Sequence, residues 1–176
     1  FDPAIDRLER SLIFDTGPGY VGHELLVPKK GDYWVLDWLP GAPALVRDGD
    51  ALGLVSNVCR HRQAQLLSGD GNTDSIVCPV HRWTYDLKGD LIGAPHFGET
   101  PCLNLSSYEL QRWNGLLFEQ NGFDVAGLLK NIGVTKDLNF DGYMLDHVEV
   151  QSKMCCGKTS NKHAEGDSHW ACIVNE

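Results

Sequence analysis

The sequence lacks any long apolar run. No uninterrupted stretch of its 176 residues approaches the roughly 18 apolar residues that a membrane-spanning helix requires. It also lacks the basic start and apolar middle of a secretory signal, because its first residues, FDPAIDRLERSLIF, mix acids with bases. These absences predict a chain that does not cross a membrane and that has a cytoplasmic location.

Basic residues are scarce relative to acidic ones. The chain has 15 Lys and Arg against 24 Asp and Glu, which gives a formal net charge of -9 at pH 7. Such a charge disfavours binding to nucleic acid or to an anionic membrane, and it favours a partner with a basic face.

Cysteine is present in an even number, which in a secreted chain would indicate disulfides. A reducing compartment is expected here, and two of the cysteines have nearby histidines that suit metal chemistry better. The six are Cys59, Cys78, Cys102, Cys155, Cys156 and Cys172.

Short apolar runs dominate the middle of the chain. They read YWVLDWL, ALVRD and ALGLVSNV from Tyr33 to Val58, then SIVCPV, RWTYDL, DLIGAP and GLLFEQ, and glycine, proline or Lys-Gly turns separate them. Short strands at close spacing are typical of a small antiparallel β-sandwich or barrel. The sequence therefore predicts a mainly all-β fold.

Two helices and a further strand complete the expected elements. Pro3 to Ile13 has apolar residues at helical spacing after Asp2, a plausible N-cap. Apolar spacing predicts a second helix over residues 124–132. From Tyr143 to Val150 apolar and polar residues partly alternate, which predicts a strand. The apolar face expected for the second helix consists of Val125, Leu128, Leu129 and Ile132.

Three parts follow from these patterns. Residues 1–32 are expected to form the N-terminal helix and a lead-in segment, and residues 33–150 to form the main domain. Residues 151–176 have little apolar periodicity and predict a loosely attached tail.

Two tight pairs of soft ligands carry the chemistry. Cys59-Arg60-His61 and Cys78-Pro79-Val80-His81 are separated by 16 residues, and a turn through residues 68–72 could bring the two loops together. Together the loops supply two thiolates and two imidazoles.

This donor set suits a [2Fe-2S] cluster of the Rieske type, with two cysteines on one iron and two histidines on the other. Replacing thiolate with neutral imidazole raises the potential, to roughly -150 to +300 mV against about -400 mV for plant-type clusters. A structural zinc site uses the same residue types. The mixed pairs and the single-residue gap between Cys59 and His61 are unlike usual zinc spacing.

The segments CRHRQAQLLSGDGN and VCPVHRWTYDLKGDLIGAP resemble the Rieske domain of ring-hydroxylating non-haem iron oxygenases, α subunit. The resemblance extends over about residues 14 to 150. It implies a Rieske-type β-sandwich or barrel with a cluster-binding subdomain. It also implies that Cys59 and Cys78 hold a buried iron, and that His61 and His81 hold the outer iron where electrons enter and leave.

Related Rieske types fit less well. Cytochrome bc-type proteins have an extra cysteine beyond each ligand pair, and this chain has none there, so no disulfide clamp is expected. Small Rieske ferredoxins lack the long N-terminal segment.

The chain also departs from the oxygenase pattern: Gln63 and Arg82 stand where the family commonly has glycine, and Val80 where it commonly has tyrosine. For Arg82, a raised cluster potential and a docking surface for an acidic partner are both left open.

The family's catalytic iron site is missing from this sequence. Beyond residue 150 the only histidines are His163 and His169, and neither lies in the acid-x-x-His-x4-His arrangement of the family's mononuclear iron ligands. No catalytic residue is predicted, and whether the chain alone is an enzyme is left open. A truncated or frameshifted gene, an artificial boundary and a single-domain descendant would each explain this.

Three functions are therefore weighed. The first is the electron-transfer domain of an aromatic-ring-hydroxylating-type oxygenase, which receives electrons from a flavin reductase or ferredoxin and passes them toward mononuclear iron, in a family that often forms homotrimers. The second is a free-standing Rieske electron carrier or redox sensor. The third is a zinc-binding module.

The remaining candidate residues have structural expectations. His23, His96 and His147 have no recognisable ligand partner, so surface or hydrogen-bonding roles are expected. Trp83 and Tyr85 are expected to shield the cluster loops with apolar rings and polar tips. The other histidines and cysteines of the tail follow no compact ligand pattern.

Overall fold

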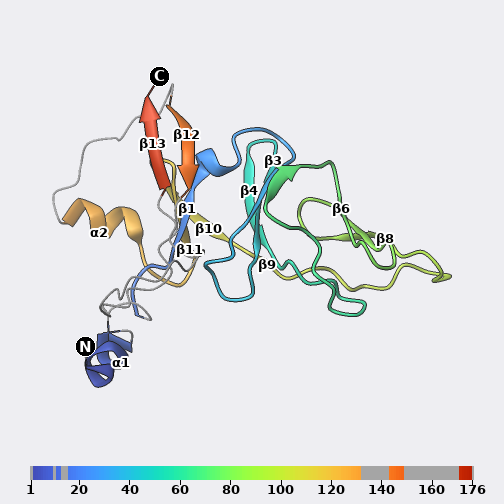
Figure 1. Ribbon diagram of the computed structural model, residues 1–176, viewed down its shortest axis with the longest axis horizontal. Coiled ribbons are helices and arrows are strands. Elements are labelled where there is room, and N and C mark those ends of the chain that lie inside the picture. The colour runs from blue at the N-terminus through green and yellow to red at the C-terminus, as the bar shows by residue number, and fades with distance from the viewer. Residues whose placement is uncertain (1, 10, 13–15, 132–142, 149–170, 176) are drawn as a thin grey trace, which may run out of the picture.

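The computed structural model describes residues 2–9, 11–12, 16–131, 143–148 and 171–175. Within them, short antiparallel strands outnumber the helices, which confirms the mainly all-β prediction (Figure 1). No helix in the described part of the chain is long and apolar enough to cross a membrane. The elements are α1 (Pro3–Glu9), β1 (Tyr20–His23), the 3-10 helix η2 (Glu24–Leu26), β2 (Asp32–Val35), β3 (Ala44–Asp48), β4 (Ala51–Val55), β5 (Asp70–Asn72), β6 (Ile76–Val77), β7 (Thr84–Tyr85), β8 (Leu91–Gly93), β9 (Ser107–Tyr108), β10 (Leu110–Trp113), β11 (Leu116–Glu119), α2 (Val125–Asn131), β12 (Tyr143–Val148) and β13 (Ala171–Asn175).

A five-stranded antiparallel sheet, in the order β5-β2-β3-β4-β9, forms the middle of the molecule. Its central strand β3 is buried on both faces, with Ala44 and Leu45 0% exposed and Val46 1% exposed. Because successive side chains of a strand point to opposite faces, Ala44 and Val46 enter one core while Leu45 enters the other. The sheet is therefore the shared wall of two hydrophobic cores.

The two cores are closed by two three-stranded sheets. The sheet β6-β7-β8 covers one face and contributes Ile76 and Tyr85 to what we call the site core. The sheet β1-β11-β10 contributes Val21 and Leu117 to the opposite core. Figure 1 shows these two sheets on either side of the five-stranded sheet.

Both predicted helices form, and an aspartate side chain caps the N-terminus of each. The side chain of Asp2 accepts a hydrogen bond from Ala4 N–H at 2.8 Å, and that of Asp124 accepts from Gly127 N–H at 3.0 Å. The expected apolar face of α2 is only partly correct, because Val125 is buried while Leu128 is 44% exposed. Ile13 and Ile132 lie outside the described residues.

The segment between the two ligand pairs differs from expectation. Residues 68–72 were expected to form a turn, but Asp70–Asn72 form the edge strand β5, which pairs with β2. Glycine at position 71 permits this pairing, because a Cβ there would lie 2.8 Å from the Tyr33 hydroxyl oxygen. The excursion is therefore part of the central sheet.

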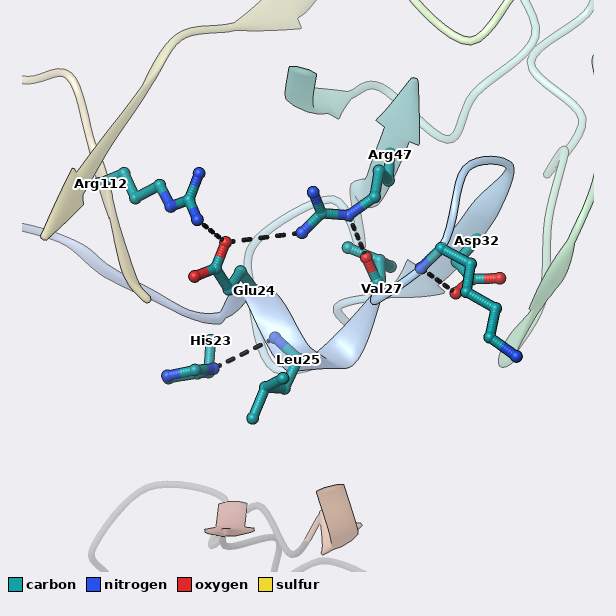
Figure 2. A network of polar contacts seen from close by, with 8 residues as sticks. His23, Glu24, Leu25, Val27, Asp32, Arg47 and Arg112 are labelled. Carbon is teal, nitrogen blue, oxygen red and sulfur yellow. Dashed lines mark hydrogen bonds and ion pairs between the residues drawn. The ribbon is translucent and has the colours of Figure 1, made fainter. Parts of the chain in front are cut away.

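A polar network anchors the lead-in segment to both sheets of the opposite core (Figure 2). The Glu24 carboxylate forms ion pairs with Arg47 of β3, at 3.6 Å, and with Arg112 of β10. The Arg47 Nε–H also donates to the Val27 carbonyl, and His23 Nδ1 accepts from Leu25 N–H at 3.1 Å. These contacts hold β1 and η2 against the body of the domain.

The predicted tail falls mostly outside the described residues. Of its residues, Ala171–Asn175 form β13, which pairs antiparallel with β12. The predicted strand from Tyr143 corresponds to β12, which ends at Val148.

Candidate metal centre

The first ligand loop is closed by backbone hydrogen bonds at its base. Gln63 N–H donates to the Cys59 carbonyl at 2.9 Å, and Cys59 N–H donates to the Ala64 carbonyl at 2.8 Å. Below this turn the buried Asn57 amide donates to the Leu67 carbonyl at 2.9 Å and accepts from Leu67 N–H at 2.8 Å. The side chain of Asn57 thus joins the two ends of the loop as a strand partner would.

The second ligand loop repeats the same backbone frame. Arg82 N–H donates to the Cys78 carbonyl at 3.1 Å, and Cys78 N–H donates to the Trp83 carbonyl at 2.8 Å. In each loop the residue four positions after the cysteine therefore closes the turn. Two turns of one geometry present their cysteines from equivalent positions.

These closing positions have left-handed backbone conformations. Gln63 has φ 57° and Arg82 has φ 61°, a region that disfavours any residue with a Cβ by roughly 1–2 kcal/mol. These are the two places where the resembling family commonly has glycine. The turn geometry explains that glycine, and this chain keeps the geometry with larger side chains.

The four predicted ligands are sorted by type. Cys59 and Cys78 are each 1% exposed and belong to the same buried core. His61 and His81 are both half-buried. Their rings contact each other edge to face, with centroids 4.6 Å apart and planes at 66°. The structure thus places the two thiols in one buried core and the two imidazoles against each other, with the thiols buried and the imidazoles half-buried.

One imidazole has a ring nitrogen that the described protein does not satisfy. His61 Nδ1 is buried and has no hydrogen-bond partner within the described residues. Desolvation lowers the pKa of His61, and the neighbouring charges of His81 and Arg62 lower it further. A neutral imidazole with a buried lone pair is the form that binds a metal ion.

Aromatic rings surround His61. The indole of Trp83, 1% exposed, stacks on the His61 ring with centroids 4.8 Å apart and an interplanar angle of 7°. Phe97 meets His61 edge-on at 6.0 Å and Trp83 at 5.3 Å. The predicted shielding by Trp83 is confirmed, although its indole N–H has no partner among the described residues.

Tyr85 connects the site core to the first cysteine. Its hydroxyl lies 3.5 Å from Cys59 Sγ and accepts a hydrogen bond from Arg60 N–H at 3.1 Å. Burial, and then the hydrogen bond to Cys59, raise the pKa of Tyr85, so the phenol keeps its proton. With Cys59 as a thiolate, Tyr85 is the donor and Sγ the acceptor.

The pKa of Cys59 reflects this setting. Burial alone would raise it, but hydrogen bonds from Tyr85, from the His61 and Arg62 backbone and from Cys78 outweigh burial and lower it. The loop therefore favours the thiolate, which is the form that ligates metal.

The donor set fits a binuclear cluster of the Rieske type. Such a cluster takes two protein donors at each iron, thiolates at one and imidazoles at the other. The thiol pair, the imidazole pair and the unpartnered His61 Nδ1 fit this requirement.

The other candidate residues are not part of the two ligand loops. His23 is buried and hydrogen-bonded, and His96 is exposed, as expected. His147 belongs to β12, opposite Cys172. Cys102 is exposed, and Cys102, Cys59 and Cys78 are all free cysteines.

Sequence reasoning did not identify Phe97 or Asn57 as contributors to the site. Phe97 follows β8 by a short loop, and nothing in its local sequence indicates a contact with His61. Asn57 stands two residues before Cys59, where its proximity was a usable signal, but its bond to Leu67 depends on the loop's return path.

Comparison with known proteins identifies this arrangement. Residues 19–109 match the profile of the Rieske [2Fe-2S] domain. Putrescine 2-hydroxylase of Ralstonia nicotianae is 57% identical over 150 residues, which cover 85% of this chain and 41% of that protein. Putrescine 2-hydroxylase of Bordetella bronchiseptica is 44% identical over 165 residues, covering 85% and 38%. This chain thus spans about two fifths of these relatives.

Solved structures give the same fold. Naphthalene 1,2-dioxygenase from Rhodococcus sp., bound to indole, is 26% identical and superposes with a TM-score of 0.66. The match covers 86% of this chain and 39% of the dioxygenase chain.

A further relative was matched by sequence. The α subunit of chlorobenzene dioxygenase from Cupriavidus sp. is 28% identical over 166 residues, or 89% of this chain and 36% of that subunit.

Proposed function

The chain belongs to the Rieske [2Fe-2S] family and holds the cluster-binding domain of a Rieske oxygenase-type protein, and from this premise we propose that it is the electron-transfer part of that protein. In this proposal Cys59 and Cys78 bind one iron, and His61 and His81 bind the other. The observation that carries the assignment is the sorting of these ligands, with thiols buried and imidazoles half-buried. When bound, the cluster accepts and releases one electron.

The surrounding residues each have a role at the cysteine and histidine atoms. Tyr85 donates a hydrogen bond to Cys59 Sγ, which stabilises negative charge there. Trp83 stacks on the His61 ring and Phe97 contacts it edge-on, so both shield part of this ring from water. The side of the site that the cysteines occupy is closed by the site core, so a redox partner approaches from the imidazole side.

The partners proposed for this domain follow from the family. The electron donor is a flavin reductase or a ferredoxin, and the acceptor is the mononuclear iron of an oxygenase catalytic domain. Assembly as a homotrimer, with the acceptor in a neighbouring subunit, is part of the same proposal.

The identities favour one substrate class for the whole oxygenase. The two putrescine 2-hydroxylases are 57% and 44% identical to this chain, whereas the aromatic-ring dioxygenase α subunit is 28% identical. We therefore infer that the associated catalytic domain hydroxylates an aliphatic diamine. Aromatic ring hydroxylation is the less favoured reading.

Cluster analysis tests the ligand proposal. We expect two irons and two acid-labile sulfides per chain, and a Rieske-type EPR signal after reduction with dithionite. The Cys102→Ser variant should keep both, because Cys102 is exposed and remote from the ligand loops in sequence. A colourless protein that contains zinc would contradict the proposal.

Chimaeric proteins test the substrate class. Residues 1–150 of this chain would replace the matching part of the Ralstonia nicotianae putrescine 2-hydroxylase or of the chlorobenzene dioxygenase α subunit. We expect product formation coupled to donor oxidation with the first and little with the second. Efficient coupling in the dioxygenase alone would reverse the assignment.

A further inference from the structure

The two ligand loops have side chains at their rims that packing does not explain. Gln63 and Arg82 adopt left-handed conformations, yet both side chains are exposed. A glycine would form either turn with less strain and lose no buried contact. Of the two, Arg82 also adds a charge, and a charged side chain that the surrounding structure does not require is a reason to look for a function outside the fold.

The loops also have charges of one sign. Residues 59–67 and 78–85 contain Arg60, Arg62 and Arg82 and no Asp or Glu, although the whole chain has a net charge of -9. All three arginines are exposed, and the ion pairs of the described residues lie elsewhere, at Glu24. The site is therefore a local basic area on an acidic protein.

Exposed apolar side chains lie in the second ligand loop and beside His61. Val80, between Cys78 and His81, is 58% exposed, and Phe97, which contacts His61, is 48% exposed. We call Val80, Phe97 and the two imidazoles the imidazole edge. Apolar residues beside an arginine are the usual composition of a protein–protein contact.

We propose that Arg82 is a specificity-determining contact for a protein electron donor that presents carboxylates around its own redox centre. This inference rests on the electron-transfer function proposed above and names the chemistry of the donor. The Arg82 guanidinium engages a donor carboxylate while Val80 and Phe97 are covered, and the donor's centre is brought to the imidazole edge.

The net negative charge of the chain does not oppose this contact at moderate salt. The Debye length is about 10 Å at 0.1 M ionic strength, so charges distant from the contact are screened while Arg82 is not. At about 1 M the length falls to about 3 Å and the contribution of Arg82 is lost as well.

The test uses the cluster-loaded protein and an acidic plant-type [2Fe-2S] ferredoxin as the donor. Dissociation constants of the oxidised pair and rates of cluster reduction are measured for the parent and three variants. Arg82→Gln removes the charge and keeps a side chain at the left-handed position, and Arg82→Lys keeps the charge. Gln63→Gly is the matched control, because it relaxes the same turn in the other loop without changing charge.

At about 0.1 M salt we expect Arg82→Gln to weaken binding and slow reduction about fivefold. Arg82→Lys should retain most of both, Gln63→Gly should match the parent, and the difference should vanish at about 1 M salt. Reduction by photoreduced deazaflavin, a small molecule that needs no docking, should be equal in all four proteins.

Other results overturn the inference in distinguishable ways. Equal binding and rates for Arg82→Gln and the parent would remove Arg82 from donor recognition while leaving electron transfer intact. A loss that is equal with deazaflavin would assign Arg82 to the cluster's potential instead. Self-association of the parent that Arg82→Gln abolishes would make a second copy the occupant. A parent that deazaflavin reduces but no protein donor does would refute the electron-transfer function itself.

Discussion

His23 in the opposite core and His61 in the site core are two sheltered imidazoles with different surroundings. Burial is the leading cause of a lowered pKa at both. Their neighbours separate them: His23 lies beside Glu24 and Arg112 and its Nδ1 accepts from Leu25 N–H (Figure 2), whereas the His61 ring lies 4.6 Å from a second imidazole, that of His81. The direction of a pKa shift thus fails to distinguish a structural histidine from a candidate ligand, and the presence of a second potential ligand beside the ring distinguishes them.

The same asparagine substitution at both positions gives the largest expected contrast. His61→Asn should abolish the Rieske EPR signal, because an amide is a poor replacement for the imidazole ligand. His23→Asn should retain full iron and sulfide, because the side-chain amide oxygen can accept the Leu25 N–H bond. Iron and sulfide analysis with EPR measures both. A cluster that persists in His61→Asn would remove this histidine from the ligand set.

Truncation of a buried and of a half-buried tryptophan compares what each contributes to the free energy of unfolding. Trp83→Ala should lower the free energy of unfolding by about 3–5 kcal/mol, because it empties a buried indole site and removes the ring stacked on His61. The half-buried Trp34 is the control, and Trp34→Ala should cost clearly less. Urea denaturation of the cluster-free proteins isolates packing from metal binding. Equal losses for the two variants would contradict the expected difference in burial.

Tyr85→Phe addresses the potential of the site. The Tyr85 hydroxyl stabilises negative charge on Cys59, so its hydrogen bond favours the reduced cluster. Losing about 1 kcal/mol of that preference should lower the midpoint potential by roughly 40 mV for one electron. Spectroelectrochemical titration measures the shift. A higher potential in the variant would be the opposite sign and would exclude this role.

The smallest expected effect concerns backbone conformation. Gln63→Gly should stabilise the cluster-free protein by up to about 1 kcal/mol, because relief of the left-handed strain exceeds the added entropy of the unfolded chain. Ala51, at the start of β4, provides the contrast, since Ala51→Gly should destabilise an extended position. Thermal denaturation compares them. Destabilisation by Gln63→Gly would mean that the side chain makes a contact that outweighs its strain.

The sequence predicted the local features well. Pairwise spacing predicted Cys59, His61, Cys78 and His81 as a set, and the structure places the two cysteines in one core and the two histidines against each other. Asp2 predicted the start of the first helix, because an N-cap acts within its own turn, and apolar spacing predicted the second helix. Short apolar runs predicted β3 and β4, since such a run is also a local property of the sequence.

The features that were missed depend on distant partners. β5 was expected to be a turn because Ser, Gly, Asp and Asn fill it, and its pairing with β2 was not visible in the local residues. β1 joins β11 from nearly the other end of the described domain. Phe97 reaches His61 only because β8 returns past the second loop. Local composition does not contain these return paths.

Strand β3 couples the unfolding of the two hydrophobic cores. Its Leu45 side chain completes one core and Val46 completes the other, so neither core can open while the other remains whole. We expect the amide protons of Leu45 and Val46 to exchange with solvent only through global unfolding. The site core and the ligand loops that it supports should consequently unfold as one cooperative unit with the sheet that anchors the N-terminal segment.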